Sequence, residues 1–278
     1  MLALSIYNTK GDRAMAKVIA FANQKGGVAK TTTTFNIAAT VATRGQKVLM
    51  VDMDSQASLT ISAGLEPLEL SRTIFDILDN DPVPTKECIV ELEHIENLSI
   101  LPSSIDLAVM ELKILLRPLP QGERNRLHAG STVLVKALSQ IEPDYDFIFI
   151  DCPPQLSILT LNALAATDEV IAPVKTDYLA KRGLEHLMDT VEDIRRNVNE
   201  RVFVRGIIAT LYEKSTKSDR EILELLERQN NVLGVIKKAA AAKKGVVGGY
   251  PVVLLPNHKN QPVAVEYTRI ADTIIKEK

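Results

Sequence analysis

Short apolar runs rich in Val, Ile and Leu alternate along the chain with segments whose apolar positions recur at helical spacing. The apolar runs predict strands at residues 18–22, 47–51, 98–101, 147–150, 169–174, 203–210 and 251–255. The helical spacing predicts helices at residues 31–44, 105–116, 131–141, 183–197, 219–229 and 263–276. Strands that alternate with helices indicate βαβ units, right-handed crossovers and a mainly parallel sheet.

The alternation shows no internal repeat and no domain-sized linker. We therefore expect a single-domain α/β fold with a mainly parallel twisted sheet flanked by helices, spanning residues 17–278. Residues 1–16 show no clear helical or strand periodicity and are expected to form an N-terminal extension without regular structure. A length of 278 residues is near the upper end of what one hydrophobic core supports.

Composition agrees with this fold class. Hydrophobic residues make up 46% of the chain and aromatic residues only 4%, without any Trp, so the core must consist of aliphatic side chains. Cys88 and Cys152 are too few for a disulfide framework or a zinc site, which fits a reducing cytoplasm. No apolar stretch is long enough to span a membrane, so we expect a soluble cytoplasmic protein without a membrane partner.

Charge is distributed unevenly along the chain. The formal net charge is −2, which excludes a global basic field. From residue 195 onward, however, 16 Lys and Arg face 9 Asp and Glu. This local excess keeps an electrostatic contact with DNA open for the C-terminal third.

A glycine-rich segment separates the first predicted strand from the first predicted helix. It reads Asn23-Gln-Lys-Gly-Gly-Val-Ala-Lys-Thr-Thr. Two adjacent glycines allow successive N–H groups to point at phosphate oxygens, and the following helix adds the positive end of its dipole. In such a loop Lys30 would contact the β- and γ-phosphates of a nucleotide, and the Thr31 hydroxyl would ligate Mg²⁺.

The loop departs from the standard Gly-x-x-x-x-Gly-Lys-[Ser/Thr] pattern, because Gln24 and Ala29 stand at its two glycine positions. It matches the deviant form Lys-Gly-Gly-x-x-Lys-[Thr/Ser], and the chain thereby resembles the ParA/MinD group of deviant Walker A P-loop ATPases, most closely the ParA/Soj partition ATPases. The resemblance implies that Lys25 crosses a dimer interface to the partner's ATP. A positive φ at Ala29 would be strained. The residues expected to bind ATP are Lys25, Gly26, Gly27, Val28, Ala29, Lys30, Thr31 and Thr32.

Two aspartates follow the second apolar run. Alternate residues of an extended chain share one face, so Asp52 and Asp54 can both point at the phosphates. The resemblance assigns Asp54 to positioning the attacking water and Asp52 to supporting Mg²⁺ through water. An acidic loop at the end of a strand is the alternative interpretation.

A third aspartate ends the apolar run at residues 147–150. This run and the Cys-Pro-Pro that follows Asp151 resemble the Walker B strand of the same family. A buried strand that ends in a carboxylate suits delivery of Asp151 to the outer shell of the metal. Cys152 is interpreted as a packing residue, because no histidine nearby in the sequence could activate it as a nucleophile.

These features predict an ATPase with ATP and Mg²⁺ as cofactors, and the resemblance implies that its turnover is slow. Catalysis would rest on positioning and on neutralisation of charge by Lys25, Lys30 and Mg²⁺, with Asp54 at the water. The resemblance implies a homodimer when ATP is bound, which binds nonspecific double-stranded DNA and is released on hydrolysis. It also implies a ParB-like adaptor protein and association with the nucleoid during chromosome or plasmid partition.

The resemblance covers about residues 17–212 and fades beyond them. The candidates for DNA binding are four C-terminal lysines, Lys237, Lys238, Lys243 and Lys244. A solvated helix face whose lysines serve solubility is the alternative. The first predicted strand begins near Val18, which leaves no room for an N-terminal helix-turn-helix domain and favours the small chromosomal type.

Several other functions are alternatives to DNA partition, and most of them require a particular feature. A protein cargo in place of DNA stays open, since cargo choice lies with the adaptor. A membrane-bound MinD-type ATPase should end in an aromatic-rich amphipathic helix, which the tail lacks. An iron-protein-type reductase needs a cluster-binding cysteine pair, a ligase of the dethiobiotin synthetase type needs a small-molecule pocket, and a non-hydrolysing ATP clamp has no need of Asp54.

Overall fold

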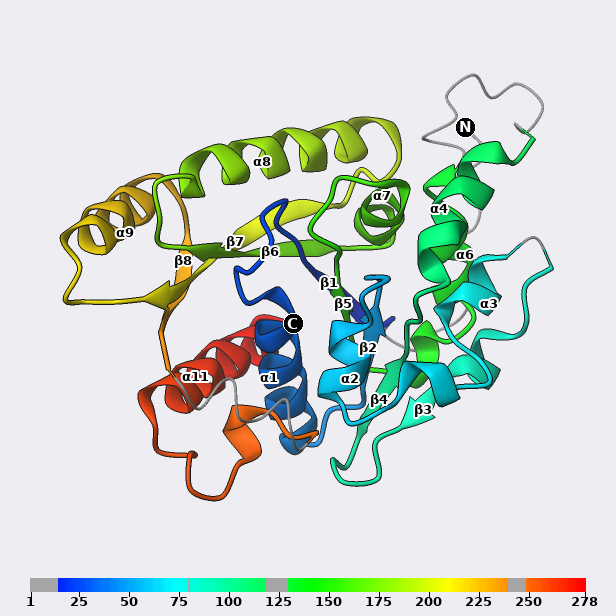
Figure 1. The fold of residues 1–278 in the computed structure, drawn as a ribbon, viewed down its shortest axis with the longest axis horizontal. Helices are drawn as coiled ribbons and strands as arrows, with labels where there is room; N and C mark the ends of the chain where they lie inside the picture. Colours follow the sequence, from blue (N-terminus) through cyan, green and yellow to red (C-terminus); the bar gives the residue numbers. More distant parts are fainter. Residues whose placement is uncertain (1–14, 80, 119–129, 240–248) are drawn as a thin grey trace.

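Eight strands form one sheet in the described part of the chain, residues 15–79, 81–118, 130–239 and 249–278 of a computed structural model (Figure 1). The strand order is β3-β4-β2-β5-β1-β6-β7-β8, and every neighbouring pair is parallel except β3 with β4. The strands are β1 (Lys17–Phe21), β2 (Val48–Asp52), β3 (Val90–Glu91), β4 (Leu98–Leu101), β5 (Phe147–Asp151), β6 (Glu169–Lys175), β7 (Phe203–Tyr212) and β8 (Val232–Lys237).

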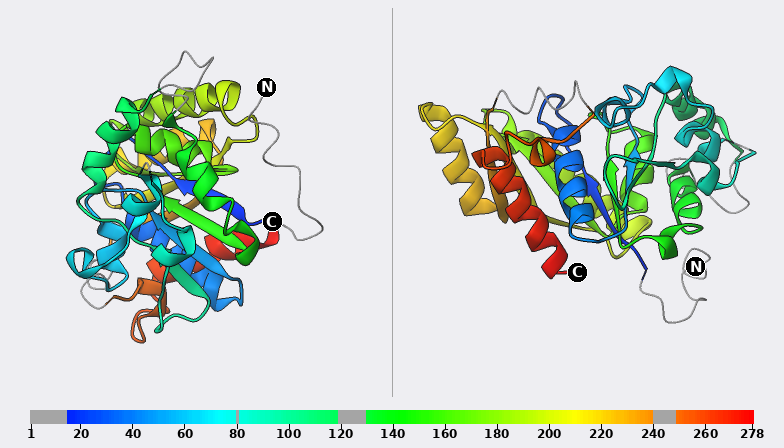
Figure 2. Two further views of the ribbon diagram at one scale, coloured as in Figure 1. Left: turned by 90° about the vertical axis from the view of Figure 1, so that its right-hand side faces the viewer. Right: turned by 90° about the horizontal axis from the view of Figure 1, so that it is seen from below.

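Helices cover both faces of the sheet (Figures 1 and 2). One face packs against α1 (Lys30–Thr43), α2 (Ser58–Ser62) and α11 (Pro262–Lys276). The other packs against α3 (Ile74–Leu78), α4 (Leu107–Leu116), α6 (Val133–Leu138), α7 (Ile158–Ala165), α8 (Ala180–Asn197) and α9 (Lys217–Gln229). Short 3-10 turns are η2 (Pro67–Glu69), η3 (Thr85–Cys88), η4 (Glu142–Asp144) and η6 (Val252–Leu254).

The central strands are buried on both faces, as a parallel sheet between two helical layers requires. All five residues of β2 and of β5 are buried. Helix α1 is buried along most of its length because it lies between the sheet and α11. In contrast, α8 buries one stripe and exposes a charged face, so it lies at the surface. Among the described residues, no helix is both long and apolar enough to cross a membrane.

The predicted α/β class with a mainly parallel sheet is confirmed, and most predicted elements appear within a few residues of their expected bounds. The strand expected at residues 251–255 is wrong. Val252–Leu254 is a 3-10 turn, and the backbone N–H of Val253 donates to Asn36 Oδ1, 3.1 Å away, instead of to a neighbouring strand. Flanking Pro251 and Pro256 lack the N–H groups that a strand ladder needs.

The last strand of the sheet is β8, which the sequence pattern did not reveal. Gly234 interrupts its apolar run, and a glycine inside a strand weakens a strand prediction. The structure gives the reason for this glycine. A Cβ at position 234 would lie 2.6 Å from Glu266 Oε1 and 2.6 Å from Ile270 Cδ1, so a larger residue would require these two side chains of α11 to move.

The parallel arrangement brings the carboxyl ends of β1, β2, β5 and β6 to one edge of the sheet. Phe21 of β1 and Asp52 of β2 both pair with Asp151 of β5, so the ends of these three strands are level. In open α/β sheets, ligands bind at the carboxyl ends of the strands. They bind at the topological switch point, where the connections from two neighbouring strands run to opposite sides of the sheet. The fold therefore places the glycine-rich loop and the predicted aspartates together.

Candidate functional site

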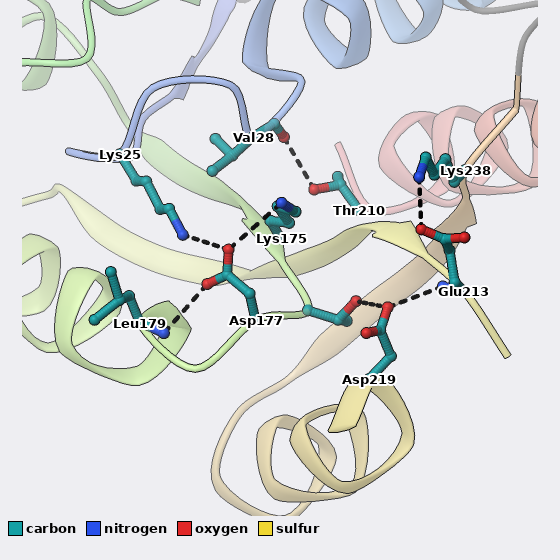
Figure 3. A network of polar contacts seen from close by, with 10 residues as sticks. Lys25, Val28, Lys175, Asp177, Leu179, Thr210, Glu213, Asp219 and Lys238 are labelled. Carbon is teal, nitrogen blue, oxygen red and sulfur yellow. Dashed lines mark hydrogen bonds and ion pairs between the residues drawn. The ribbon is translucent and has the colours of Figure 1, made fainter. Parts of the chain in front are cut away.

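The loop between β1 and α1 is fixed by contacts with β6 and β7. The buried Asn23 donates from Nδ2 to the carbonyl of Pro173 at 2.7 Å and accepts from the backbone N–H of Lys25 at 2.9 Å. The carbonyl of Val28 accepts from Thr210 Oγ1 at 2.9 Å (Figure 3). The loop is thus anchored at both ends in the structure without a ligand.

Two residues of the loop have left-handed backbone. Gly27 has φ 70°, and Ala29, which precedes α1, has φ 63° and ψ 34°. The left-handed region costs a residue with a Cβ about 1 kcal/mol. Ala29 thus adopts the positive φ for which the sequence analysis expected strain, and the size of that strain stays a prediction.

Lys30 begins α1 and points back into the loop. Its side chain is buried, and Nζ donates to the carbonyls of Asn23 at 3.1 Å and Lys25 at 3.2 Å. Burial lowers the pKa of Lys30, and the nearby Asp151 carboxylate opposes this shift. A cation enclosed by a loop at a helix N-terminus suits the charge of nucleotide phosphates.

Asp151 at the end of β5 contacts the first turn of α1. Thr31 Oγ1 donates to Asp151 Oδ2 at 2.6 Å, and Thr34 Oγ1 lies 3.4 Å from Asp151 Oδ1. Burial raises the pKa of Asp151 to about 8, and the charge of Asp52 acts in the same direction. A hydroxyl beside a carboxylate is the hard-oxygen donor set that Mg²⁺ takes when nucleotide phosphates and waters complete its shell.

Within the described ranges, no three His, Cys, Asp or Glu side chains are grouped so that they could hold a metal by themselves. Cys152 follows Asp151 and is buried, and burial raises the pKa of its thiol far above the ordinary value. Its interpretation as a packing residue fits this environment.

Asp52 is fully buried at the end of β2 and organises the loop that follows. Its Oδ1 accepts from the backbone N–H of Asp54 at 3.1 Å, and its Oδ2 accepts from the N–H and the hydroxyl of Thr60 at 2.9 and 2.8 Å. Burial raises its pKa to about 6, and the hydrogen bonds from Thr60 oppose this shift. Its role in supporting Mg²⁺ stays a prediction, and the contact with Thr60 was not anticipated from the sequence.

Asp54 lies just beyond β2 and is half-buried. Its Oδ1 accepts from the N–H of Gln56 at 3.0 Å, and its carbonyl accepts from Ser103 Oγ at 2.8 Å. The strand ends at Asp52, so these turn contacts rather than strand alternation orient Asp54. Its charge acts on both Lys30 and Asp151, which places it near the phosphate-binding loop.

Lys25 forms an ion pair that the sequence analysis did not anticipate. Its Nζ donates to Oδ2 of Asp177, which lies two residues beyond β6 (Figure 3). Lys175 Nζ lies 3.7 Å from the same oxygen. A carboxylate just past the end of a parallel strand was the signal that pointed to Asp54, and the same rule could have found Asp177.

The described DNA-binding candidates lie away from helices. Lys237 ends β8 and Lys238 follows it, so the alternative of a solvated helix face is wrong for this pair. Lys238 Nζ donates to Glu213 Oε1 at 2.7 Å, and both side chains are exposed (Figure 3). Lys243 and Lys244 lie outside the described residues.

Comparisons with known proteins show which family the chain resembles over most of its length. A family model described as an AAA domain matches residues 16–204. The sporulation initiation inhibitor protein Soj of Bacillus subtilis is 34% identical over 243 residues, which cover 86% of this chain and 91% of Soj. The chromosome partitioning protein ParA of Caulobacter vibrioides is 32% identical over 206 residues, covering 74% of this chain and 73% of ParA.

One solved structure is similar in both sequence and fold. It is cobyrinic acid a,c-diamide synthase from Mycobacterium smegmatis with bound ADP and magnesium. The two chains are 32% identical, with a TM-score of 0.77 and coverage of 95% of each.

Proposed function

The chain belongs to the ParA/Soj family of P-loop ATPases, and from this premise we propose that it is a DNA-partition ATPase that acts as an ATP-dependent dimer. Its cofactors are ATP and Mg²⁺. In this proposal two subunits enclose two nucleotides, the dimer binds nonspecific double-stranded DNA, and hydrolysis releases it. A ParB-like adaptor would link the dimer to its cargo at the nucleoid.

The observation that carries the proposal is that the buried Lys30 ammonium and the hydrogen-bonded pair of Thr31 and Asp151 lie together at one edge of the sheet. Lys30 supplies a buried cation within the loop, and the N-terminus of α1 supplies N–H donors for phosphate oxygens. Thr31 and Asp151 are the residues that would hold Mg²⁺, which when bound neutralises charge on the β- and γ-phosphates. Lys25, Gly26, Gly27, Val28, Ala29, Lys30, Thr31 and Thr32 are proposed to contact ATP.

Asp54 is proposed to orient the water that attacks the γ-phosphate. Its carboxylate is half-buried and is held by the N–H of Gln56, so it has a defined position and access to solvent. Turnover is proposed to be slow, as expected when catalysis rests mainly on positioning of the water and on neutralisation of charge. A slow reaction would give the ATP-bound dimer a long lifetime.

Lys25 is proposed to complete the partner's site. Its side chain is partly exposed, and its ion-pair partner among the residues that the structure describes is Asp177, so it can reach outward when a second subunit approaches. A lysine supplied in trans would act as an arginine finger does, by neutralising charge that develops in the transition state. Hydrolysis would then require both subunits.

Lys237 and Lys238, together with Lys243 and Lys244, are the proposed DNA contacts. Contacts of lysines with phosphate carry no sequence information, so binding should be nonspecific and strongly dependent on salt. A protein cargo carried through an adaptor is the second candidate, because the nucleotide site would be the same.

The test is binding of nonspecific duplex DNA to the protein without nucleotide, with ADP and with ATP, for the wild type, Lys25→Ala and Asp54→Ala. The proposal expects DNA binding that needs ATP, is lost in Lys25→Ala and persists in Asp54→Ala. ATP-driven dimerisation without any DNA binding would reject the DNA role and leave the ATPase. That outcome would favour a protein cargo. It would equally favour a small-molecule substrate, as in the similar cobyrinic acid a,c-diamide synthase.

A further inference from the structure

We propose that Asp177 is a latch that holds Lys25 inside its own subunit, and that Lys175 replaces Lys25 on this carboxylate when the dimer forms. Asp177 is thus a positioning residue that acts on the site through Lys25. This inference rests on the ATP-dependent dimer of the proposed function. The ion pair between Lys25 and Asp177 must open before that dimer forms, which costs free energy. It is derived from the contacts that Figure 3 shows at the turn between β6 and α8.

The carboxylate is held in place by its own turn. Asp177 Oδ1 accepts from the N–H of Leu179 at 3.2 Å, and the Asp177 carbonyl accepts from the N–H of Ala180 at 3.0 Å. The adjacent Thr176 donates from Oγ1 to Asp219 Oδ2 at 2.9 Å, which ties the turn to α9. The acceptor therefore stays where it is while its cationic partners change.

Lys25 is the mobile member of the pair. Its backbone N–H is fixed on Asn23, but its side chain is 31% exposed, as is 28% of the Asp177 side chain. An ion pair with this access to water contributes little free energy, so a stronger ionic interaction can replace it. The negatively charged phosphates in a partner's site would offer the Lys25 ammonium such an interaction.

Lys175 makes the exchange possible without leaving the carboxylate unpaired. Its Nζ lies 3.7 Å from Asp177 Oδ2, the same oxygen that accepts from Lys25. When Lys25 leaves, Lys175 needs to move less than 1 Å to reach hydrogen-bonding distance, about 2.8 Å for charged partners. The two lysines therefore compete for one oxygen, and removal of either should strengthen the hold of the other.

A two-fold symmetric dimer must open two such latches. Suppose that each ion pair of Lys25 with Asp177 raises the dimer dissociation constant about threefold. Loss of both ion pairs should then lower this constant about tenfold, since the two factors multiply. Asp177→Asn is suited to this test, because the amide oxygen can still accept from the N–H of Leu179 while the charge is removed. Lys175→Gln should act in the opposite direction and raise the dissociation constant.

The experiment is sedimentation equilibrium with Mg²⁺ and a non-hydrolysable ATP analogue, with ADP as reference. Expected is a tighter dimer for Asp177→Asn, a weaker dimer for Lys175→Gln and a wild-type value for Asp177→Glu. Asp272→Asn is the matched control. It breaks the 2.9 Å ion pair between Asp272 of α11 and Arg44, and it leaves the turn between β6 and α8 unchanged. A weaker or unchanged dimer in Asp177→Asn overturns the latch.

A second measurement separates the latch from the proposed function. If the wild type stays monomeric with the ATP analogue, the dimer proposal fails, and the latch is then judged by hydrogen exchange without nucleotide. Lys25→Gln should leave exchange of the Leu179 and Ala180 amides near the wild-type rate, because Lys175 takes the place of Lys25 on Asp177. The double variant Lys25→Gln, Lys175→Gln should increase this exchange severalfold, because Asp177 then lacks both cations. An increase in Lys25→Gln as large as in the double variant, or no increase in the double variant, would overturn the latch whatever the state of the dimer.

Discussion

The edge of the sheet at β1, β2 and β5 and the surface at the end of β8 both carry lysines, but in opposite environments. Lys30 is 8% exposed and is enclosed by backbone carbonyls and by Asp151. Lys238 is exposed, and its described contact is one ion pair with Glu213. The first lysine belongs to a network in which most polar atoms have fixed partners, and the second to a solvated surface.

This difference decides how much each region depends on single residues. Burying a charge costs desolvation free energy, which its surroundings must offset. Replacement of a buried charged residue should therefore change nucleotide binding, the free energy of unfolding and the pH dependence of that free energy together. An exposed charge is screened by water and salt, so its effect is small and adds to that of its neighbours. We therefore expect large effects at the loop and graded effects at the end of β8.

The largest effect is expected for Lys30→Met, which removes the enclosed cation and keeps a side chain of similar length. Loss of one preorganised charge at the phosphates should lower the rate of ATP hydrolysis about 100- to 1,000-fold. Phosphate release at saturating ATP measures this. The melting temperature without nucleotide should not fall, because burial already disfavours the ammonium, and a lower value would mean that Lys30 is needed for folding.

The second effect is a change in pH dependence for Asp151→Asn. An aspartate has an ordinary pKa of 3.8, and in the folded protein that of Asp151 is about 8. The folded state therefore binds the proton more tightly than the unfolded state, and the wild type loses stability as pH rises from about 4 to 8. The variant should be more stable than the wild type at pH 8, by about 2 kcal/mol, and equal to it near pH 4.

Urea unfolding of the nucleotide-free protein at pH 4, 6 and 8 measures this difference. Asp52, whose pKa is about 6, still titrates in the variant, so a smaller decline between pH 4 and 6 should remain. Asp272→Asn is the control of opposite sign, because Arg44 lowers the pKa of Asp272 and its charged form contributes stability above the unfolded pKa. A gain at pH 8 in both variants would show that the effect is not specific to burial.

At the end of β8, the double variant Lys237→Gln, Lys238→Gln should weaken binding of duplex DNA about tenfold at moderate salt. The slope of log affinity against log salt should become less steep by about 1.8, because two phosphate contacts are lost. Fluorescence anisotropy with two unrelated duplexes measures both values. Lys86→Gln, at an exposed ion pair with Asp144, is the control, and an equal loss there would show a general effect of charge.

The smallest effect is expected for Ala29→Gly, which relieves the left-handed backbone in front of α1. Glycine adopts φ 63° without the Cβ cost, so the free energy of unfolding should rise by about 1 kcal/mol and the melting temperature by about 2 °C. Ala108→Gly, at an exposed position of α4, is the control and should lose about 1 kcal/mol. A loss in both variants would mean that the left-handed conformation carries no cost at Ala29.

Much of the fold could be read from the sequence because its central strands carry a local signal. β1, β2 and β5 are short apolar runs that end in a glycine-rich loop or in an aspartate, and their bounds were found within one residue. The outer elements were harder to find. β8 contains a glycine against which two side chains of α11 pack closely, and Val252–Leu254 has the composition of a strand but forms a 3-10 turn.

The sequence by itself determined the phosphate-binding loop and the aspartates that follow the apolar strands, because each depends on residues adjacent along the chain. Only the tertiary structure decided which side chains meet across the sheet edge. Lys25 and Asp177 are 152 residues apart, and Asp151 meets Thr31 across 120 residues. These contacts follow from the order of β5, β1 and β6 in the sheet, which long-range burial of the strands sets and no local pattern records.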